Sequence, residues 1–163
     1  MNEKDVKNQE HYTSGKLEPI QLMSDSYDFD FTSYCLGNIL KYLVRYPKKN
    51  GMEDLRKARV YAEFIFNHRQ GRPLKSHVTQ EDASKFTLEE SYWTNTGSHE
   101  EYIVCFNLAD ELMGDEIVEG VNEDQEIALA HIIFAMRNSE KSGFIVHTID
   151  KLIKYETALK RIS

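Results

Sequence analysis

The feature of the sequence that most constrains the fold is a pair of helix-like patterns on either side of a short turn. In the first pattern, over about residues 32–46, apolar and polar residues each recur at the i, i+3, i+4, i+7 spacing of one helix face. The apolar face carries Leu36, Ile39, Leu40 and Leu43. The polar face carries Asn38, Lys41, Tyr42 and Arg45. This helix can therefore bury one side while it presents two cations, an amide and a phenol on another.

The second pattern covers about residues 52–69 and follows the same helical spacing. Its polar line carries Asp54, Lys57 and Tyr61, and its apolar line carries Leu55, Ala58 and Ala62. Between the two patterns, Pro47 stops the first helix, and Asn50 with Gly51 supplies a chain reversal. We expect an antiparallel helical hairpin whose two polar lines face the same cleft.

The rest of the chain predicts further helices and no strand, because no segment alternates apolar and polar residues as a half-buried strand would. Capping-box patterns begin at Thr79, Thr87 and Ser98, each with an acidic residue three positions later. With the apolar periodicity, they predict helices at about 80–92, 99–113, 123–138 and 142–161, and a short helix that begins near Ile20. The expected fold is all-α, a compact bundle of five or six helices built on the N-terminal hairpin.

Charge divides the chain into a basic and an acidic part. Residues 1–75 contain 13 Lys and Arg against 10 Asp and Glu, whereas residues 76–163 contain 7 against 17. A helix-breaking segment at residues 71–73 marks the boundary. We expect a mobile tail at 1–10, a ligand-binding hairpin at 11–72, and an acidic helical part at 73–163 that belongs to the same globular unit. With a net charge of −7, the basic patch suits a small anion better than nucleic acid, whose backbone would meet the acidic part.

Several familiar sites are absent from the sequence. It contains no GxxxxGK[ST] or GxGxxG phosphate loop, no HExxH, no GxSxG and no Cys/His cluster with zinc spacing. Cys35 and Cys105 lie in apolar helical context, so we expect buried free thiols. The acidic run at 110–126 is interpreted as solvated surface, with a Mg²⁺ site as the alternative. Because no stretch of about 18 apolar residues occurs and residues 1–10 are too polar for a secretory signal, we expect a soluble cytoplasmic protein.

The candidate site combines the two polar lines with the turn and one residue of the N-terminal segment. It comprises His11, Asn38, Lys41, Tyr42, Arg45, Lys48, Lys49, Asp54, Lys57 and Tyr61. Arg and Lys neutralise phosphate, Asn reads a base or ribose edge, and Tyr stacks on a base, so these are the parts of a mononucleotide site. Lys41, Arg45 and Asp54 are the candidate catalytic residues, and the other seven are candidate substrate-binding residues. The alternative is a solvated charged face.

The order of short motifs over residues 11–66 resembles a known family. HY, EPI, GNxxKYxxR, KK and EDLxKAxxY follow one another in this stretch. The order is similar to that of the small SaV-like domain of tailed-phage proteins, a family that includes the small nucleotide kinase of T-odd coliphages. One departure is Tyr46 with Pro47, where the family more often has small residues. The resemblance implies a phage protein that handles nucleotides in the cytoplasm of the bacterial host.

Three functions remain open from the sequence. The first is a (deoxy)nucleoside monophosphate kinase without a P-loop, in which the cations stabilise the transferring phosphoryl group and ATP is the candidate donor. The second is a noncatalytic phage protein that sequesters a nucleotide or engages a host defence protein. The third is a metal-dependent nucleotide pyrophosphohydrolase that uses the acidic run. A long apolar stretch at 127–136 adds the expectation of a homo-oligomer.

Overall fold

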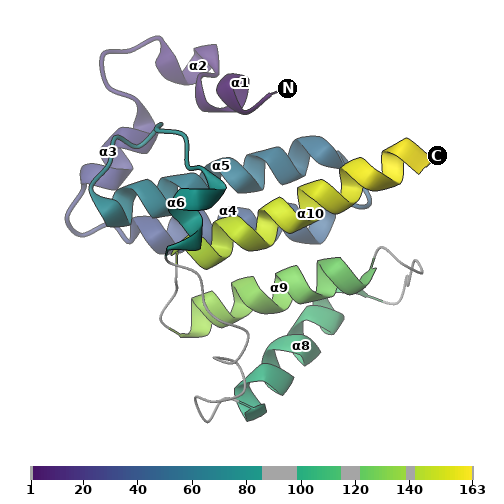
Figure 1. Ribbon diagram of the computed structural model, residues 1–163. Coiled ribbons are helices and arrows are strands. Elements are labelled where there is room, and N and C mark those ends of the chain that lie inside the picture. The colour runs from purple at the N-terminus through teal and green to yellow at the C-terminus, as the bar shows by residue number, and fades with distance from the viewer. Residues whose placement is uncertain (1, 86–98, 115–121, 139–141, 163) are drawn as a thin grey trace.

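The computed structural model describes residues 2–85, 99–114, 122–138 and 142–162, and within these ranges the chain is helical with no strand (Figure 1). The five long helices are α4 (Phe31–Arg45), α5 (Met52–Gln70), α8 (His99–Met113), α9 (Asn122–Arg137) and α10 (Ser142–Ile162). The short helices are α1 (Glu3–Lys7), α2 (Glu10–Thr13), α3 (Pro19–Asp25) and α6 (Gln80–Ser84). The prediction of an all-α fold is confirmed.

Helices α4 and α5 form the antiparallel hairpin that the two patterns predict. Helix α4 begins where the Asp30 side chain accepts a hydrogen bond from the Ser33 N–H at 3.0 Å, which satisfies one of the free donors of the first turn. The chain reverses at Gly51, whose φ of 51° would strain any residue with a side chain. Helix α5 ends at Gly71, which has the left-handed conformation typical of a helix C-terminus. Local sequence therefore sets both ends of the hairpin.

The buried stripe of α4 lies slightly to one side of the predicted one. Six of the seven residues predicted to face inward are buried, namely Leu36, Ile39, Leu43, Leu55, Ala58 and Ala62. Leu40 is only partly buried. Tyr42, expected on the polar face, is buried instead and only 9% exposed. The stripe runs through Cys35, Ile39 and Tyr42, which leaves Leu40 at its edge.

The C-terminal helices pack against one side of the hairpin. Helix α10 packs on α5 and α9 packs on α4, while α8 packs against α9 and lies at the periphery (Figure 1). Ile132 of α9 and Ile149 of α10 are fully buried in the core that the hairpin shares with these helices. The Gln125 side chain donates a hydrogen bond to the Leu43 carbonyl at 2.9 Å, so α9 is also tied to the last turn of α4.

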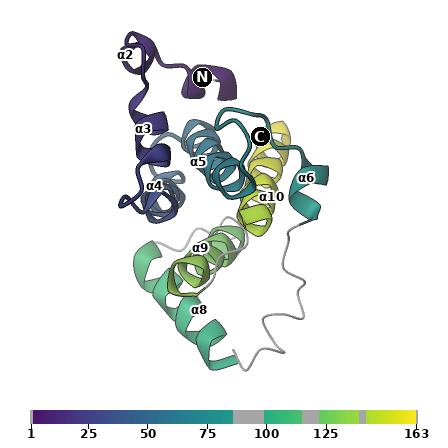
Figure 2. The same ribbon diagram turned by 90° about the vertical axis from the view of Figure 1, so that its left-hand side faces the viewer.

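The N-terminal helices lie on the side of the hairpin away from α8 (Figure 2). Helix α1 packs on α5, and Lys7 forms an ion pair with Glu63 at 3.2 Å. The mobile tail predicted for residues 1–10 did not anticipate this helix. The sequence has no apolar periodicity there because α1 has no fully buried residue; ion pairs attach it to α5, and Val6 packs partly buried against the core.

Most of the remaining helix predictions are confirmed. Helices α8, α9 and α10 lie at the predicted ranges, give or take one residue. The capping box at Thr79 is complete, because the Asp82 N–H donates to Thr79 Oγ1 and the Thr79 N–H donates to Asp82 Oδ2, each at 3.1 Å. Helix α6 ends at Ser84, and residues 86–92 with the caps at 87 and 98 lie outside the described residues.

The two thiols and the membrane prediction can also be compared with the structure. Cys35 and Cys105 are buried and free, as predicted. Burial raises the pKa of the Cys105 thiol to about 11, so it stays protonated at neutral pH. Within the described ranges, no helix combines the length and the apolar character that crossing a membrane requires.

Candidate functional site

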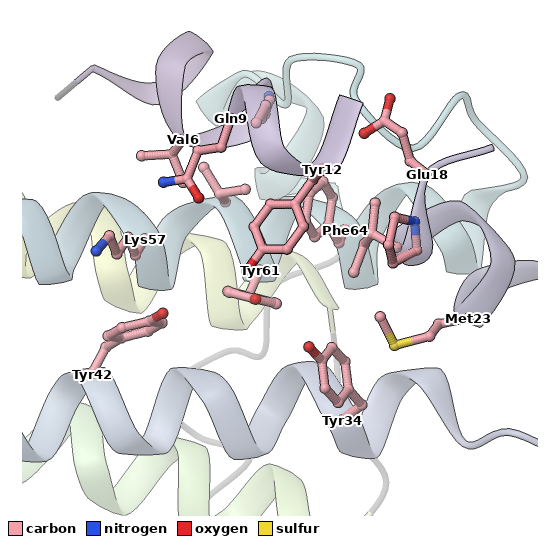
Figure 3. Close-up of a pocket in the computed structure, with 14 residues that line it drawn as sticks. Val6, Gln9, Tyr12, Glu18, Met23, Tyr34, Tyr42, Lys57, Tyr61 and Phe64 are labelled. Carbon is pink, nitrogen blue, oxygen red and sulfur yellow. The ribbon is translucent and has the colours of Figure 1, made fainter. Parts of the chain in front are cut away.

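A pocket of about 280 Å³ lies between the N-terminal helices and the hairpin (Figure 3). One wall, the N-terminal wall, comes from residues 6–23 of α1, α2 and α3, and the other, the hairpin wall, comes from α4 and α5. Both walls contribute aromatic side chains to the cavity. Its four tyrosines are Tyr12, Tyr34, Tyr42 and Tyr61. We call it the tyrosine pocket.

Tyr61 lies at the centre of the hairpin wall. Its ring centroid is 6.1 Å from the rings of both Tyr34 and Tyr42, and it meets the Phe64 ring edge to face at 5.7 Å. Burial raises the pKa values of the Tyr42 and Tyr61 phenols. Both hydroxyls are therefore neutral at physiological pH and can donate hydrogen bonds, so this wall offers flat apolar faces with polar tips.

Lys57 lines one end of the pocket and two further cations lie beside Tyr42 outside the lining; we call this group the cationic end. Lys57 lines the cavity, and Figure 3 shows it at the same end as Tyr42, opposite Glu18 and Met23. Lys41 Nζ lies 4.7 Å from the centroid of the Tyr42 ring, and Arg45 Cζ lies 5.0 Å from the same centroid. The pocket thus has an aromatic middle and a positively charged end.

Arg45 is held in place by a bidentate ion pair with a buried acid. Its Nε donates to Asp54 Oδ2 and its Nη2 donates to Asp54 Oδ1, each at 3.0 Å, while Asn50 donates to Oδ1 at 3.4 Å. Burial alone would raise the pKa of Asp54, but the hydrogen bonds from Arg45 and Asn50 outweigh it and lower that pKa. The same hydrogen bond raises the pKa of Arg45. Asp54 therefore stays ionised and fixes the guanidinium.

The structure brings most, though not all, of the predicted site residues together. Tyr42, Lys57 and Tyr61 line the pocket. Lys41 and Arg45 lie beside Tyr42, Asp54 holds Arg45, and Asn38 accepts a hydrogen bond from Lys41 Nζ at 3.4 Å.

The other seven predicted residues lie outside the pocket lining: Asn38, Lys41, Arg45 and Asp54 lie near Tyr42, and three more lie farther from it. Lys48 and Lys49 are exposed in the turn between α4 and α5. His11 is exposed on α2, and its ring lies 4.0 Å from that of Tyr12, which does line the pocket. Roles for these three residues stay predictions.

The sequence interpretation missed the N-terminal wall and Tyr34. Tyr34 lies four residues before Asn38 on the same helix face, so extending the polar line by one turn would have found it. Tyr12 and Glu18 belong to the HY and EPI motifs that carry the family resemblance, but no local pattern assigned them to the site. They reach the pocket only through the packing of α1 to α3 on the hairpin.

One cluster brings three potential metal ligands together, but its neighbours do not suit a cation. The ligand atoms of Glu3, Glu63 and His77 lie within 4.8 Å of one another. Lys7 Nζ is 3.2 Å from a carboxylate oxygen of each acid, and Arg59 Nη1 is 2.9 Å from Glu63. Because two cations already neutralise these acids, the cluster is an ion-pair network that holds α1 to α5.

The described part of the acidic run contains a close pair of carboxyl groups. A hydrogen bond with Asp110, together with burial, raises the pKa of Glu126 to about 7. The pair joins α8 to α9, and residues 115–121 of the run lie outside the described residues. A metal site in the acidic run therefore stays a prediction.

Comparison with known proteins gives matches to the N-terminal part of the chain. A family model described as a protein of unknown function, DUF3310, matches residues 6–63. The Gene 1.7 protein of Enterobacteria phage T3 is 39% identical over 71 residues, which are 40% of this chain and 44% of that protein. The predicted resemblance to a phage domain family is thus confirmed. No solved structure matches the chain.

The matched segment coincides with the pocket. Of the residues that line the cavity, all except Phe64 lie within residues 6–63. The match spans less than half of the phage T3 protein, and the matched segment of the family model ends at residue 63, before α6 begins. The part of the chain that resembles the phage family is therefore the part that builds the tyrosine pocket.

Proposed function

We propose that the protein binds a nucleoside phosphate in the tyrosine pocket, with the base against the tyrosine rings and the phosphate at the cationic end. The observation that carries this proposal is a single cavity with four tyrosines and Lys57 in its lining, and with Lys41 and Arg45 beside Tyr42 just outside the lining. A nucleotide has the same division, because its base is flat and apolar on both faces and its phosphate is an anion.

The physical chemistry of each part supports this orientation. Stacking of a base on an aromatic side chain is worth about 1 to 3 kcal/mol and tolerates any base. Arg45 is already held in one geometry by Asp54, so binding a phosphate oxygen would cost little further side-chain entropy. Lys57 and Lys41 would add point charges. The neutral phenol of Tyr42 would donate a hydrogen bond to the sugar or the base.

The activity that we propose is phosphoryl transfer to a bound nucleoside monophosphate, with ATP as donor. Such transfer requires positioning and charge neutralisation more than covalent chemistry, so a fixed Arg and two Lys could support it without a P-loop. In this proposal Lys41 and Arg45 contact the transferring phosphoryl group. Asp54 acts through Arg45, which it orients.

A noncatalytic nucleotide-binding protein is the second candidate, and the pocket volume favours it. A cavity of about 280 Å³ is near the lower end of the roughly 300 to 1,000 Å³ typical of small-molecule sites, so it suits one nucleotide better than a donor and an acceptor together. A second cavity of about 320 Å³, which includes Asp30 and Arg69, shares no lining residue with the tyrosine pocket. Incubation of the protein with ATP and each deoxynucleoside monophosphate, followed by product analysis, separates the two candidates.

The binding experiment compares two neighbouring cations on α5. Lys57 lines the pocket, whereas Arg56 is exposed and outside the lining. Lys57→Ala should weaken nucleotide binding about ten- to a hundredfold, because it removes a charge-assisted phosphate contact of roughly 1.5 to 3 kcal/mol. Arg56→Ala removes the same charge from the same helix and should change the affinity less than about threefold. Equal affinities of the two variants in isothermal titration calorimetry would reject the site.

Assembly and protein partners stay predictions from the sequence. On α8, the side chains of Tyr102, Ile103 and Leu112 are each more than a third exposed, which is consistent with self-association through that helix. We propose a homo-oligomer on this basis. Light scattering at micromolar concentration measures the mass directly, and a monomer mass would remove the proposal.

A further inference from the structure

One lysine holds both ends of the segment that covers the tyrosine pocket. Lys75 lies in the loop between α5 and α6, and its Nζ donates to Asn8 Oδ1 at 3.1 Å and to Glu18 Oε1 at 2.7 Å. Asn8 follows α1, and Glu18 precedes α3. A further hydrogen bond, from Lys7 Nζ to the Lys75 carbonyl at 3.4 Å, lies next to this point. The chain between Asn8 and Glu18 therefore starts and ends at the same cation.

The segment between these two points buries little of its surface. Residues 9–17 contain α2 and include no buried residue, and the side chains of Tyr12 and Leu17 are 52% and 55% exposed. The hydrogen bonds from the Tyr12 N–H to Gln9 and from the Thr13 hydroxyl to Glu10 are local. Segments with so little apolar burial open at low free-energy cost, independently of the core.

The same segment carries side chains that face the cavity. Gln9 and Tyr12 line the tyrosine pocket, and Figure 3 shows the Tyr12 ring directed toward Tyr61 on the hairpin wall. Tyr12 is thus half in the pocket and half in solvent. A flat ligand seated on Tyr61 would cover the exposed part of the Tyr12 ring and give this segment the apolar contact that it lacks.

We infer that residues 9–17 form a flap over the tyrosine pocket, which Lys75 pins at both ends and which closes on a bound ligand. The inference rests on the proposed function for the identity of the ligand, a nucleoside phosphate. Closure orders Tyr12 over the base, and His11 moves with it because the two rings are in contact. Opening of the flap then limits the rate at which the ligand leaves, so loss of the Tyr12 ring raises the dissociation rate more than it lowers the association rate.

The first experiment tests the pin without any ligand. Hydrogen–deuterium exchange of residues 9–17 is compared in wild type, Lys75→Met and Lys75→Arg, with residues 52–70 of α5 as the internal control for global folding. Lys75→Met should speed exchange in the flap about three- to tenfold, because both ends lose a charge-assisted hydrogen bond, while exchange in α5 stays unchanged. Lys75→Arg keeps the donors and should stay within about twofold of wild type. If hydrogen exchange of residues 9–17 is unchanged in Lys75→Met, the proposal that Lys75 holds both ends of the flap is wrong.

The second experiment tests closure with the four deoxynucleoside monophosphates as probes, each added at saturating concentration. Binding is measured by calorimetry, and exchange of residues 9–17 is measured on the same samples. A probe that binds should slow exchange in the flap at least about threefold and protect the exposed Lys16 from trypsin. Tyr12→Ala should abolish this protection, whereas Tyr12→Phe should keep it.

The two proposals fail in different ways. Binding heat with unchanged exchange of residues 9–17 overturns the flap and leaves the nucleotide site in place. No binding heat with any nucleotide rejects the proposed function and with it ligand-driven closure, while the ligand-free experiment on Lys75 still decides whether the segment is pinned.

Discussion

The two walls of the tyrosine pocket are held by different forces. The hairpin wall is backed by fully buried apolar side chains such as Ile39, Leu43 and Leu55. The N-terminal wall has no fully buried residue in α1, α2 or α3: Val6, Ile20 and Met23 pack partly buried against the core, and ion pairs such as Lys7 with Glu63 add to the attachment. One wall is therefore part of the core, whereas the other is attached to its surface. A ligand can meet a preorganised face on one side and an adjustable one on the other.

The largest expected effect comes from the hairpin wall. Leu43→Ala should lower the free energy of unfolding by about 2 to 5 kcal/mol, because Leu43 is fully buried and the cavity left behind is not refilled. Leu40→Ala, at the edge of the same buried stripe and only partly buried, should cost clearly less. Urea denaturation of both variants measures the difference. A Leu43→Ala cost below that of Leu40→Ala would contradict the assignment of the core.

The next largest effect on stability concerns the bidentate ion pair between Arg45 and Asp54, next to the turn of the hairpin. Asp54→Asn should cost about 1 to 3 kcal/mol at pH 7, because it replaces two hydrogen bonds between charged groups with weaker ones.

The same variant should also change the pH dependence of stability. The pKa of Asp54 is lowered in the folded protein, so its stabilising contribution is present above the unfolded pKa of about 3.9 and is lost as the pH falls through the folded pKa. Urea titrations at pH 7 and pH 3 should show a smaller difference between wild type and Asp54→Asn at pH 3. A difference that stays constant would contradict the ion pair.

A smaller loss of stability than that of Leu43→Ala is expected when the N-terminal wall loses an ion pair. Lys7→Met should reduce global stability by about 1 to 2 kcal/mol, because the pair is buried but Arg59 still neutralises the Glu63 carboxylate. It should also speed amide exchange in α1, which this ion pair ties to α5. Exchange mass spectrometry together with urea denaturation checks both parts. A loss as large as that of Leu43→Ala would show that the two walls are not held differently.

Added salt should produce the smallest effect on amide exchange, and it should distinguish the two walls without any mutation. The Debye length falls from about 10 Å at 0.1 M salt to about 3 Å at 1 M, which screens partly exposed ion pairs such as Lys75 with Glu18. Exchange in residues 3–17 should accelerate about twofold over this range. Exchange in α4 and α5 should be nearly constant because apolar burial holds them. Equal acceleration of amide exchange in both walls would contradict the view that ion pairs matter more for the N-terminal wall than for the hairpin wall.

The same difference explains how much of the molecule could be predicted from the sequence. Helix α4 follows from periodicity because it buries mainly one face, whereas residues 62–67 of α5 are all buried; local residues such as Asp30 and Gly71 mark where the hairpin begins and ends. The cationic end followed as well, since Lys41, Arg45 and Lys57 lie on those helices. The N-terminal wall did not, because contacts such as Lys75 with Glu18 join residues 57 positions apart and leave no repeating pattern in the sequence.

The buried position of Tyr42 shows a second limit of the sequence. Its phenol has the polar character expected of an exposed face, yet the ring is buried and accommodates Lys41 and Arg45 beside it. Tyrosine is ambiguous in a binary pattern because it has both an apolar body and a polar tip. The periodicity located helix α4 correctly. The predicted buried stripe is rotated from the observed one by less than the angle between successive residues.

The bidentate contact between Arg45 and Asp54 also closes the base of the turn that carries Lys48 and Lys49. With its ends joined in this way, the turn can be lengthened without separating the two helices, and each doubling of loop length costs only about 0.6 kcal/mol. A small fluorescent reporter inserted between Lys48 and Lys49 would thus leave the hairpin intact. Its position near Arg45 would let its fluorescence report directly whether the proposed nucleoside phosphate binds.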